Sequence, residues 1–320
     1  MKAAVHYQNG SPSVLRYQDV PAPELEPRDV LIRVQAISIE GGDILNRRMV
    51  APVNTPHTVG YQAAGIIEAV GLEVRHLAVG QRVAAFNWAG SHAELFRAPE
   101  HFVYPIPDRL DINIAATVPV TFGTASDALF EFGRLGEGET VLIRGGTGGV
   151  GIAAIQLAKA AGAVVLATSS NDRNSAALKE LGADHIINYL TQDVVQEALR
   201  VTQNRGVDLL VDPVGGPYLS SLTNAVRYRG RVCIVGAMSG EPFKLGFLDI
   251  VSRSLSFIGI LFGREMHLPR VHQMLAQRFD EVAAGSLKMP IDRVFTLAEA
   301  AAAHAYVEND HPFGRVVMTP

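Results

Sequence analysis

A glycine-rich turn in the middle of the sequence has the spacing of a phosphate-binding loop. Gly146, Gly148 and Gly151 satisfy the pattern G-x-G-x-x-G between an apolar stretch, residues 141–144, and a stretch of helical character, residues 150–161. Small residues let the backbone approach a phosphate group, and the N–H groups at a helix N-terminus favour its negative charge. The spacing alone also occurs in simple tight turns. With a strand before it and a helix after it, the turn predicts a dinucleotide site.

The end of the next apolar stretch indicates which dinucleotide binds. An NAD site usually carries Asp or Glu here, roughly 20 residues after the turn, to hold the ribose hydroxyls. This sequence has Thr168, Ser169 and Ser170 instead, with Asp172 displaced outward and Arg173 following it. Hydroxyls and a cation suit a 2′-phosphate, and one charge-assisted hydrogen bond is worth about 1.5–3 kcal/mol. The stretch therefore predicts NADPH, and the alternative is that Arg173 is an ordinary solvent-facing residue at a helix start.

The histidines and the cysteine offer little further chemistry. The ten histidines contain no H-x-x-x-H or H-E-x-x-H pattern, so we expect His57, His76 and His92 to be structural or surface residues. The single cysteine, Cys233, excludes an intrachain disulfide, and its apolar neighbours predict a buried position in the core.

The glycine turn belongs to a series of alternating elements. From residue 140 onward, apolar strands alternate with helices predicted at 150–161, 173–181, 192–201 and 217–226. Continuous apolar strands in such an alternation indicate a parallel sheet covered on both faces. The last strand of the series, 254–262, is apolar, and an exposed edge there would favour pairing with a second copy. We therefore expect a homodimer.

The part of the chain before this series has a different pattern. Short β signals at 29–39, 63–71 and 80–86 are separated by proline and glycine. No long amphipathic helix is expected before about residue 111, where Asp111 is a candidate N-cap. This pattern predicts a mostly antiparallel β-structure, which the final segment, 288–320, is expected to rejoin.

The composition fits a two-domain protein without a polyanionic partner. The chain has 320 residues, 48% of them hydrophobic and 19% charged, and a net charge of −4, which argues against nucleic-acid binding and against an anionic membrane surface. The densest basic spot, Arg227, Arg229 and Arg231, is interpreted as a solvated turn before a strand. No stretch has the pattern of a signal peptide or the length of a membrane span, so a cytoplasmic location is expected.

An ordered series of motifs extends over nearly the whole sequence. The main ones are GYQAAGIIEAVG (60–71), VGQRVAA (79–85), the glycine turn with its flanks (138–163), GVDLLVDPVGG (206–216) and GRVCIVGA (230–237). This series resembles the medium-chain dehydrogenase/reductase superfamily, and within it the zinc-free quinone oxidoreductase branch that includes the zeta-crystallin-like proteins.

The resemblance implies both fold and cofactor site. The fold would be α/β, with a Rossmann doubly wound parallel sheet at 119–264 that binds NADP and a GroES-like β-barrel catalytic domain at 1–118, joined by 265–320. The glycine turn would lie under the pyrophosphate, and other residues would lie near the adenine ribose phosphate or border the nicotinamide. For Tyr189 the alternative is that it merely ends a buried strand. The implied cofactor contacts are Thr124, Gly146, Thr147, Gly148, Gly149, Val150, Ser169, Arg173, Tyr189, Gly236, Ala237, Leu261 and Phe262.

The same resemblance implies that the chain binds no zinc. Zinc-dependent members hold the catalytic metal through a Cys, a His–Glu pair and a later Cys or Asp. Here Glu40 stands at the first Cys position and Tyr61–Gln62 at the His–Glu pair. Tyr61 and Gln62 are poor zinc ligands, so a catalytic zinc site is not expected. The structural zinc lobe of those members needs four cysteines, and this chain has one.

Without a Lewis acid, the expected acceptors are already electrophilic, as quinones and α,β-unsaturated carbonyls are. The candidate catalytic residues are Glu40, Asp43 and Tyr61, with Glu40 and Tyr61 as a proton-donating or hydrogen-bonding pair. The alternative is that Tyr61 packs under the nicotinamide while Glu40 forms a salt bridge with Arg47 or Arg48.

The leading hypothesis is an NADPH-dependent quinone oxidoreductase that acts on a small molecule. An NADPH-dependent enone, alkenal or enoyl reductase on the same scaffold is the alternative among enzymes. The branch usually has Glu where Gln62 stands and Tyr where Ser126 stands, and these differences leave the acceptor open. A nucleotide-binding protein with little catalysis is the alternative from another class.

Overall fold

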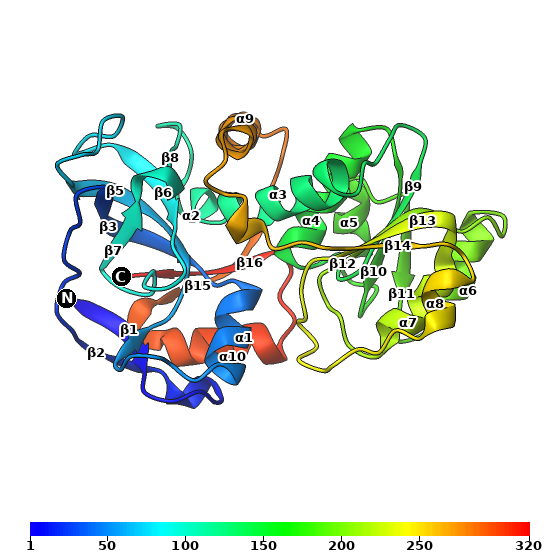
Figure 1. The fold of residues 1–320 in the computed structure, drawn as a ribbon, viewed down its shortest axis with the longest axis horizontal. Coiled ribbons are helices and arrows are strands. Elements are labelled where there is room, and N and C mark those ends of the chain that lie inside the picture. The colour runs from blue at the N-terminus through cyan, green and yellow to red at the C-terminus, as the bar shows by residue number, and fades with distance from the viewer. The chain divides into compact units, whose positions relative to one another are not determined.

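The computed structural model describes all 320 residues, and the chain divides into two compact units. Unit 1 comprises Met1–Gly123 and Gly263–Pro320, and unit 2 comprises Thr124–Phe262. Figure 1 labels their helices and strands. The predicted α/β class is confirmed, because one unit carries a parallel sheet and the other a mostly antiparallel β-structure. No helix has both the length and the apolar character that crossing a membrane requires.

Unit 1 is built on two β-sheets. A seven-stranded sheet has the order β15-β16-β3-β5-β6-β8, with β7 paired to β3, and a three-stranded sheet has the order β2-β1-β4. All pairs in both sheets are antiparallel except β15 with β16. The strands are β1 Lys2–His6, β2 Arg16–Asp19, β3 Asp29–Ser38, β4 His57–Thr58, β5 Gln62–Val70, β6 Arg82–Phe86, β7 Leu95–Pro99, β8 Val103–Pro105, β15 Ile291–Thr296 and β16 Arg315–Thr319.

The long strand β3 lies at the centre of this unit. It pairs with β5, β7 and the C-terminal strand β16. Val30, Ile32 and Val34 alternate along it and are buried, together with Ile67 of β5 and Phe96 of β7. Because successive side chains of a strand point to opposite faces, this alternation turns one face of β3 into the core.

Helices occupy the ends and the connections of unit 1. The carboxylate of Asp111 accepts hydrogen bonds from the N–H groups of Asn113 and Ile114, which confirms its predicted role as an N-cap. The nine-residue helix α1 was not predicted, because it begins with two glycines and glycine has a low helix propensity. The helices are α1 Gly41–Met49, α2 Ile112–Ala115, α3 Val118–Ser126, which continues into unit 2, α9 Pro269–Ala284 and α10 Ala300–Asn309.

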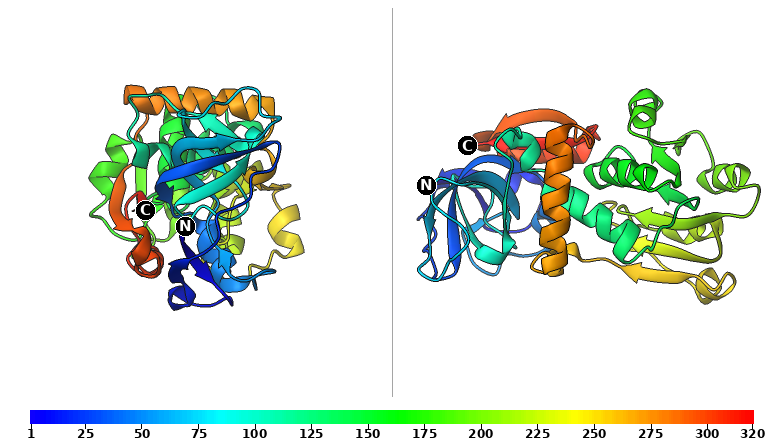
Figure 2. Two further views of the ribbon diagram at one scale, coloured as in Figure 1. Left: turned by 90° about the vertical axis from the view of Figure 1, so that its left-hand side faces the viewer. Right: turned by 90° about the horizontal axis from the view of Figure 1, so that it is seen from above.

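Unit 2 carries a six-stranded parallel sheet with the order β11-β10-β9-β12-β13-β14. The predicted alternation of strands and helices is confirmed, and Figure 2 shows the strands side by side with helices packed along them. The strands are β9 Thr140–Ile143, β10 Val164–Ser169, β11 His185–Asn188, β12 Val207–Asp212, β13 Val226–Ile234 and β14 Ser256–Gly259. The helices are α4 Gly149–Ala160, α5 Ser175–Glu180, α6 Val194–Val201, α7 Tyr218–Leu222 and α8 Phe247–Val251.

The two central strands of this sheet determine where a ligand can bind. Every residue of β9 and β12 is buried, as expected for parallel strands covered on both faces. The chain runs from β9 to β11 toward one edge and from β12 to β14 toward the other, so the strand order reverses between β9 and β12. Such a reversal leaves a crevice at the carboxyl ends of the strands, where open α/β sheets bind their ligands.

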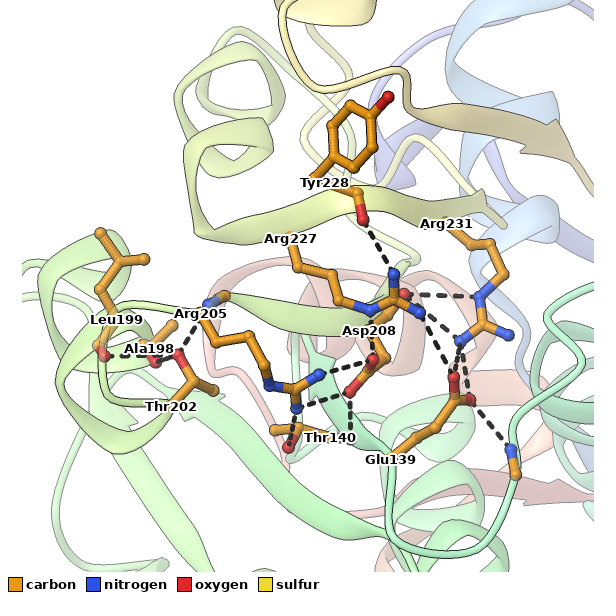
Figure 3. Close-up of polar contacts among 12 residues, drawn as sticks. Glu139, Thr140, Ala198, Leu199, Thr202, Arg205, Asp208, Arg227, Tyr228 and Arg231 are labelled. Atoms are coloured by element: carbon orange, nitrogen blue, oxygen red, sulfur yellow. Dashed lines mark hydrogen bonds and ion pairs between the residues drawn. The ribbon is translucent and has the colours of Figure 1, made fainter.

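The basic residues expected in a solvated turn lie within β13. Arg227 donates to the buried carboxylate of Asp208, and Arg231 Nη2 lies 2.7 Å from both carboxylate oxygens of Glu139 (Figure 3). Arg229 alone is exposed. The prediction is wrong for Arg227 and Arg231, because carboxylates distant in the sequence neutralise their charges.

Asp208 is the most heavily bonded carboxylate of this cluster. Both terminal nitrogens of Arg205 lie 2.9 Å from its oxygens, and the N–H of Thr140 donates to it over 2.8 Å. Burial by itself would raise the pKa of Asp208, but these hydrogen bonds and the one from Arg227 lower it to about 2.

Replacing Asp208 by Asn should therefore lower the free energy of unfolding by about 2 kcal/mol near pH 7. A carboxylate with a depressed pKa contributes stability that is present above its unfolded-state pKa of about 3.9 and is lost as the pH falls toward about 2. Urea unfolding at a series of pH values should thus show the difference between the two proteins narrowing below about pH 4. Glu180→Gln, at an exposed position of α5, is the matched control. A difference that did not change with pH would contradict this account.

Candidate active site

The glycine turn after β9 has no room for side chains on its inner face. A Cβ at Gly151 would lie 2.2 Å from the carbonyl oxygen of Gly145, and one at Gly146 would lie 3.0 Å from the Cβ of Ala167. Gly145 itself has a φ of 66°, in the left-handed region that favours glycine. The turn ends at Gly148, the N-cap of α4. The turn thus needs glycine at these positions, and it leads directly into the N-terminus of α4, the kind of helix end whose N–H groups favour an anion.

The end of β10 is bonded to the glycine turn and to the segment after β11. The carbonyl of Thr168 accepts from the N–H of Gly146 over 2.9 Å, and the carbonyl of Ser169 accepts from the N–H of Tyr189 over 3.1 Å. The structure thus brings two of the implied contacts, Ser169 and Tyr189, together. Tyr189 is 47% exposed, so it does not end a buried strand, and Arg173 before α5 is exposed as well.

The residues implied for the nicotinamide half are distributed over three places in unit 2. A Cβ at Gly236 would lie 2.7 Å from the carbonyl oxygen of Pro213, so Gly236 and Ala237 stand beside the turn after β12. Thr124 is buried in α3. Phe262 is buried at the end of the unit, whereas Leu261 is 63% exposed.

In unit 1, a buried carboxylate is the centre of a polar network. Glu40, only 3% exposed, accepts hydrogen bonds from Ser38 Oγ, Gln62 Nε2 and Arg315 Nη2. The Oε1 atom of Gln62 in turn accepts from the N–H of Val120 in α3 over 3.1 Å. Burial raises the pKa of Glu40, and Arg315, Ser38 and Gln62 oppose that rise. This one side chain therefore connects β3, β5, β16 and α1.

The partner of Glu40 differs from the predicted one. The alternative that it pairs with Arg47 or Arg48 is wrong, because Arg47 is fully buried and forms an ion pair with Glu308. Arg315 instead reaches Glu40 from the C-terminal strand.

Asp43 and Tyr61 lie next to this network. Asp43 Oδ2 accepts from the N–H of Glu40 over 2.8 Å, and the Tyr61 hydroxyl oxygen accepts from the N–H of Gly42 over 3.1 Å. Asp43 is 1% exposed, and its Oδ1 atom has no hydrogen-bond partner. Burial raises the pKa of Asp43 and that of Tyr61 well above their usual ranges. No hydrogen bond joins Glu40 to Tyr61, so the carboxyl that stands free beside the phenol is that of Asp43.

Asp43 and Tyr61 line a cavity of about 300 Å³ within unit 1. Tyr61 and Trp88 line it, and the Phe86 ring contacts both: the Tyr61 and Phe86 centroids are 5.6 Å apart, and those of Phe86 and Trp88 are 5.2 Å apart. A volume of this size accommodates a small organic molecule. The other lining residues are His6, Asn46, Val50, Ala51, Pro52, Val53, Asn54, His57, Val59 and Gly60.

Ser38, Trp88 and Arg315 belong to this site but were not predicted. Of these three, only Arg315 could have been noticed in the sequence, because it is the single charged residue of the final strand. A buried arginine requires an acidic partner, but the pattern does not say which one.

Three of the histidines and the cysteine occupy the following positions. His92 is buried with its Nε2 atom 3.0 Å from that of His304, and burial lowers its pKa to about 3. His92 is therefore structural and His76 lies on the surface, as predicted, whereas His57 lines the cavity. Cys233 is buried, which confirms the prediction, and burial raises its pKa to about 12. No group of three or more His, Cys, Asp or Glu side chains is placed to hold a metal ion.

Comparisons with known proteins agree with these features. The alcohol dehydrogenase GroES-like domain matches residues 26–108, and the zinc-binding dehydrogenase family matches residues 149–277. The quinone oxidoreductase of Pseudomonas aeruginosa is 32% identical over 316 residues, which cover 97% of each chain. The chain belongs to the quinone oxidoreductase branch of the medium-chain dehydrogenase/reductase superfamily. The predicted resemblance is thereby confirmed.

Solved structures of this branch have the same fold. The quinone oxidoreductase of Pseudomonas syringae pv. tomato is 28% identical, with a TM-score of 0.94, and the match covers 100% of this chain and 99% of that one. A mycobacterial protein whose structure was solved with NADPH is 26% identical, with a TM-score of 0.94 and complete coverage of both chains.

The ion pair of Glu40 yields a prediction about stability. Replacing Arg315 by Met should lower the free energy of unfolding by about 3–5 kcal/mol, because Glu40 would stay buried without its cation. Urea unfolding near pH 7 measures this change. Arg33→Met is the control: Arg33 lies on β3 of the same sheet, is 64% exposed and pairs with Glu68, so its loss should cost less than about 1 kcal/mol. Equal losses for the two variants would contradict a special role for the Glu40 pair.

Proposed function

We propose that this protein is an NADPH-dependent quinone oxidoreductase in which unit 2 binds the cofactor and unit 1 handles the acceptor. The domain boundaries taken from the sequence, 1–118 with 265–320 and 119–264, belong to this proposal. The main support for the proposed activity is a single observation. In a chain of the quinone oxidoreductase branch, Asp43 has an unpartnered carboxyl oxygen and lines the same cavity as Tyr61.

The glycine turn of unit 2 fits the pyrophosphate, since any side chain added at Gly151 would collide with the backbone. Ser169, Arg173 and Tyr189 are the residues that would hold a 2′-phosphate. Strand β10 ends in Thr168 and Ser169 rather than in an acid. The carboxylate of Asp172, further along the chain, is engaged by Asn188 Nδ2 over 3.1 Å. The hydroxyls at the strand end and the engaged carboxylate support NADPH over NADH. When bound, NADPH supplies a hydride.

A quinone that has accepted a hydride is an anion and needs a proton. Asp43 is suited to donate it, because burial keeps the proton on the carboxyl and Oδ1 has no other partner. The O–H bond of Asp43 breaks, a new O–H bond forms on the acceptor, and the carboxylate left behind is reprotonated from water. Tyr61 keeps its proton and donates a hydrogen bond to the same acceptor oxygen. Glu40 then serves to fix the start of α1 rather than to supply a proton.

Zinc independence is a further part of the proposal. The residues at the ligand positions are Glu40, Tyr61 and Gln62, and Glu40 is already occupied by Arg315 and two neutral donors. Metal analysis of the purified protein tests this point, and one zinc ion per chain would overturn it.

We also propose a cytoplasmic homodimer. Strand β14 lies at the edge of the parallel sheet, so its outer hydrogen-bonding groups are available to β14 of a second copy. Phe247 and Leu248 of the preceding helix α8 are 74% and 70% exposed, which adds apolar surface that a partner would cover. The buried free thiol of Cys233 fits a reducing compartment. Light scattering that gave the mass of a monomer would overturn the dimer.

The cofactor preference yields a direct prediction. The kcat/KM with NADPH should exceed the kcat/KM with NADH. Arg173→Ala should lower the kcat/KM with NADPH by about tenfold to a hundredfold and leave the kcat/KM with NADH nearly unchanged. Lys179→Ala, on the neighbouring helix α5, is the control for a general loss of positive charge. A higher kcat/KM with NADH in the unaltered protein would overturn the assignment.

The acceptor chemistry yields a second prediction. Oxidation of NADPH should be faster with a small quinone than with an enone or without acceptor, and Asp43→Asn and Tyr61→Phe should each lower kcat at least about tenfold. Since Asp43 must carry a proton, kcat/KM should fall as the pH rises through its raised pKa, and Asp43→Asn should lack that fall. Selective turnover of the enone would show that the acceptor is an unsaturated carbonyl rather than a quinone. Negligible rates of NADPH oxidation with all acceptors would favour a nucleotide-binding protein with little catalysis. Unchanged rates in both variants would remove the proton-donating role.

A further inference from the structure

Two charged residues face each other where the strand order of unit 2 reverses. Arg144 is the first residue after β9, and Asp212 is the last residue of β12. These strands are paired in parallel, and the N–H of Arg144 donates to the carbonyl of Val211 over 3.0 Å. Both side chains therefore stand at the carboxyl ends of the two central strands, at the crevice where such sheets bind their ligands.

The side chain of Arg144 joins the end of β9 to the end of β12 and the turn that follows it. Its Nη1 atom lies 3.3 and 3.2 Å from the two carboxylate oxygens of Asp212 and 2.6 Å from the carbonyl oxygen of Gly215. The guanidinium also lies 5.6 Å from the centre of the Tyr218 ring. Since Asp212 is fully buried and the Arg144 side chain is 15% exposed, the member of the pair nearer to solvent is the cation.

Asp212 shapes the turn after β12 from the other side. Its Oδ1 atom accepts from the N–H groups of Val214 and Gly215 over 2.8 and 3.0 Å. Gly215 and Gly216 have φ values of 65° and 76°, in the left-handed region that favours glycine. A Cβ at Gly145 of the glycine turn would lie 3.3 Å from Val214 Cγ2. The two turns are therefore packed against each other, and the ion pair joins them.

We propose that Arg144, with Asp212, is a clamp that positions the glycine turn and the 213–216 turn for the part of the cofactor common to NADPH and NADH. This rests on the proposed function, because it assumes a nicotinamide dinucleotide as ligand. Arg144 acts through the backbone of the two turns, and its guanidinium would add a positive charge on the side where the phosphates would bind. It is thus distinct from Arg173, which follows β10 and would contact only the 2′-phosphate.

The test compares dissociation constants of NADPH and NADH, measured by calorimetry on the full chain. Arg144→Met should raise both by about tenfold or more and by the same factor, so that their ratio stays constant. Arg173→Ala is the matched comparison and should raise the value for NADPH alone. Arg144→Lys, which keeps the charge and a donor, should recover part of the lost affinity. A change of less than about twofold for both cofactors in Arg144→Met, or a change for NADPH alone, would overturn the clamp.

A second variant separates positioning from simple charge neutralisation. Arg144→Met leaves Asp212 buried without a cation and is expected to lower the melting temperature, whereas Arg144→Met/Asp212→Leu removes both charges and should restore it. If the pair positions the turns, the double variant still binds both dinucleotides weakly. If it bound them as tightly as the unaltered protein, the clamp would be overturned while the proposed function stood. An unaltered protein that bound neither dinucleotide would overturn both proposals.

Discussion

The parallel pairing of β9 with β10 and β12 brings turns that are far apart in the sequence to one edge of a sheet, because parallel strands all end on the same side. The glycine turn is bonded there to Thr168 at the end of β10, and Arg144 joins it to the turn after β12. The proposed phosphate site is made of backbone N–H groups rather than side chains. Its geometry therefore depends on this register, which also brings Arg144 and Asp212 together.

In unit 1, the main constraint is the burial of two acidic side chains. Glu40 and Asp43 both lie at the start of α1 and are almost fully buried. Glu40 has three side-chain donors, so it can remain a carboxylate, whereas Asp43 has no side-chain donor and no cation bonded to it. Because an unpaired buried charge is costly, the second carboxyl favours its protonated form. Two neighbouring acids thereby acquire different chemistry from their surroundings alone.

Local sequence patterns predict the structure correctly where the physical cause is itself local. The helix after the glycine turn, the N-cap Asp111, the buried thiol Cys233 and the parallel alternation of unit 2 all follow from spacing within a few residues. The errors have a common origin. Arg227 and Arg231 are expected in solvent, and one alternative pairs Glu40 with a nearby arginine, because a sequence shows charges but not the partners that burial requires. Helix α1 was overlooked because it starts with two glycines and depends on Asp43 for its cap.

The sequence by itself therefore determined the family, the alternation of strands and helices in unit 2, and the turn that fits a phosphate group, since each depends on residue types at short, regular spacing. Tertiary structure alone decided which carboxylates are neutralised and which one keeps a free oxygen. Arg315 meets Glu40 from the opposite end of the chain, and Arg144 meets Asp212 from a neighbouring strand. Such pairs form because buried charges must find partners wherever the folded chain provides them, and sequence distance places no limit on that choice.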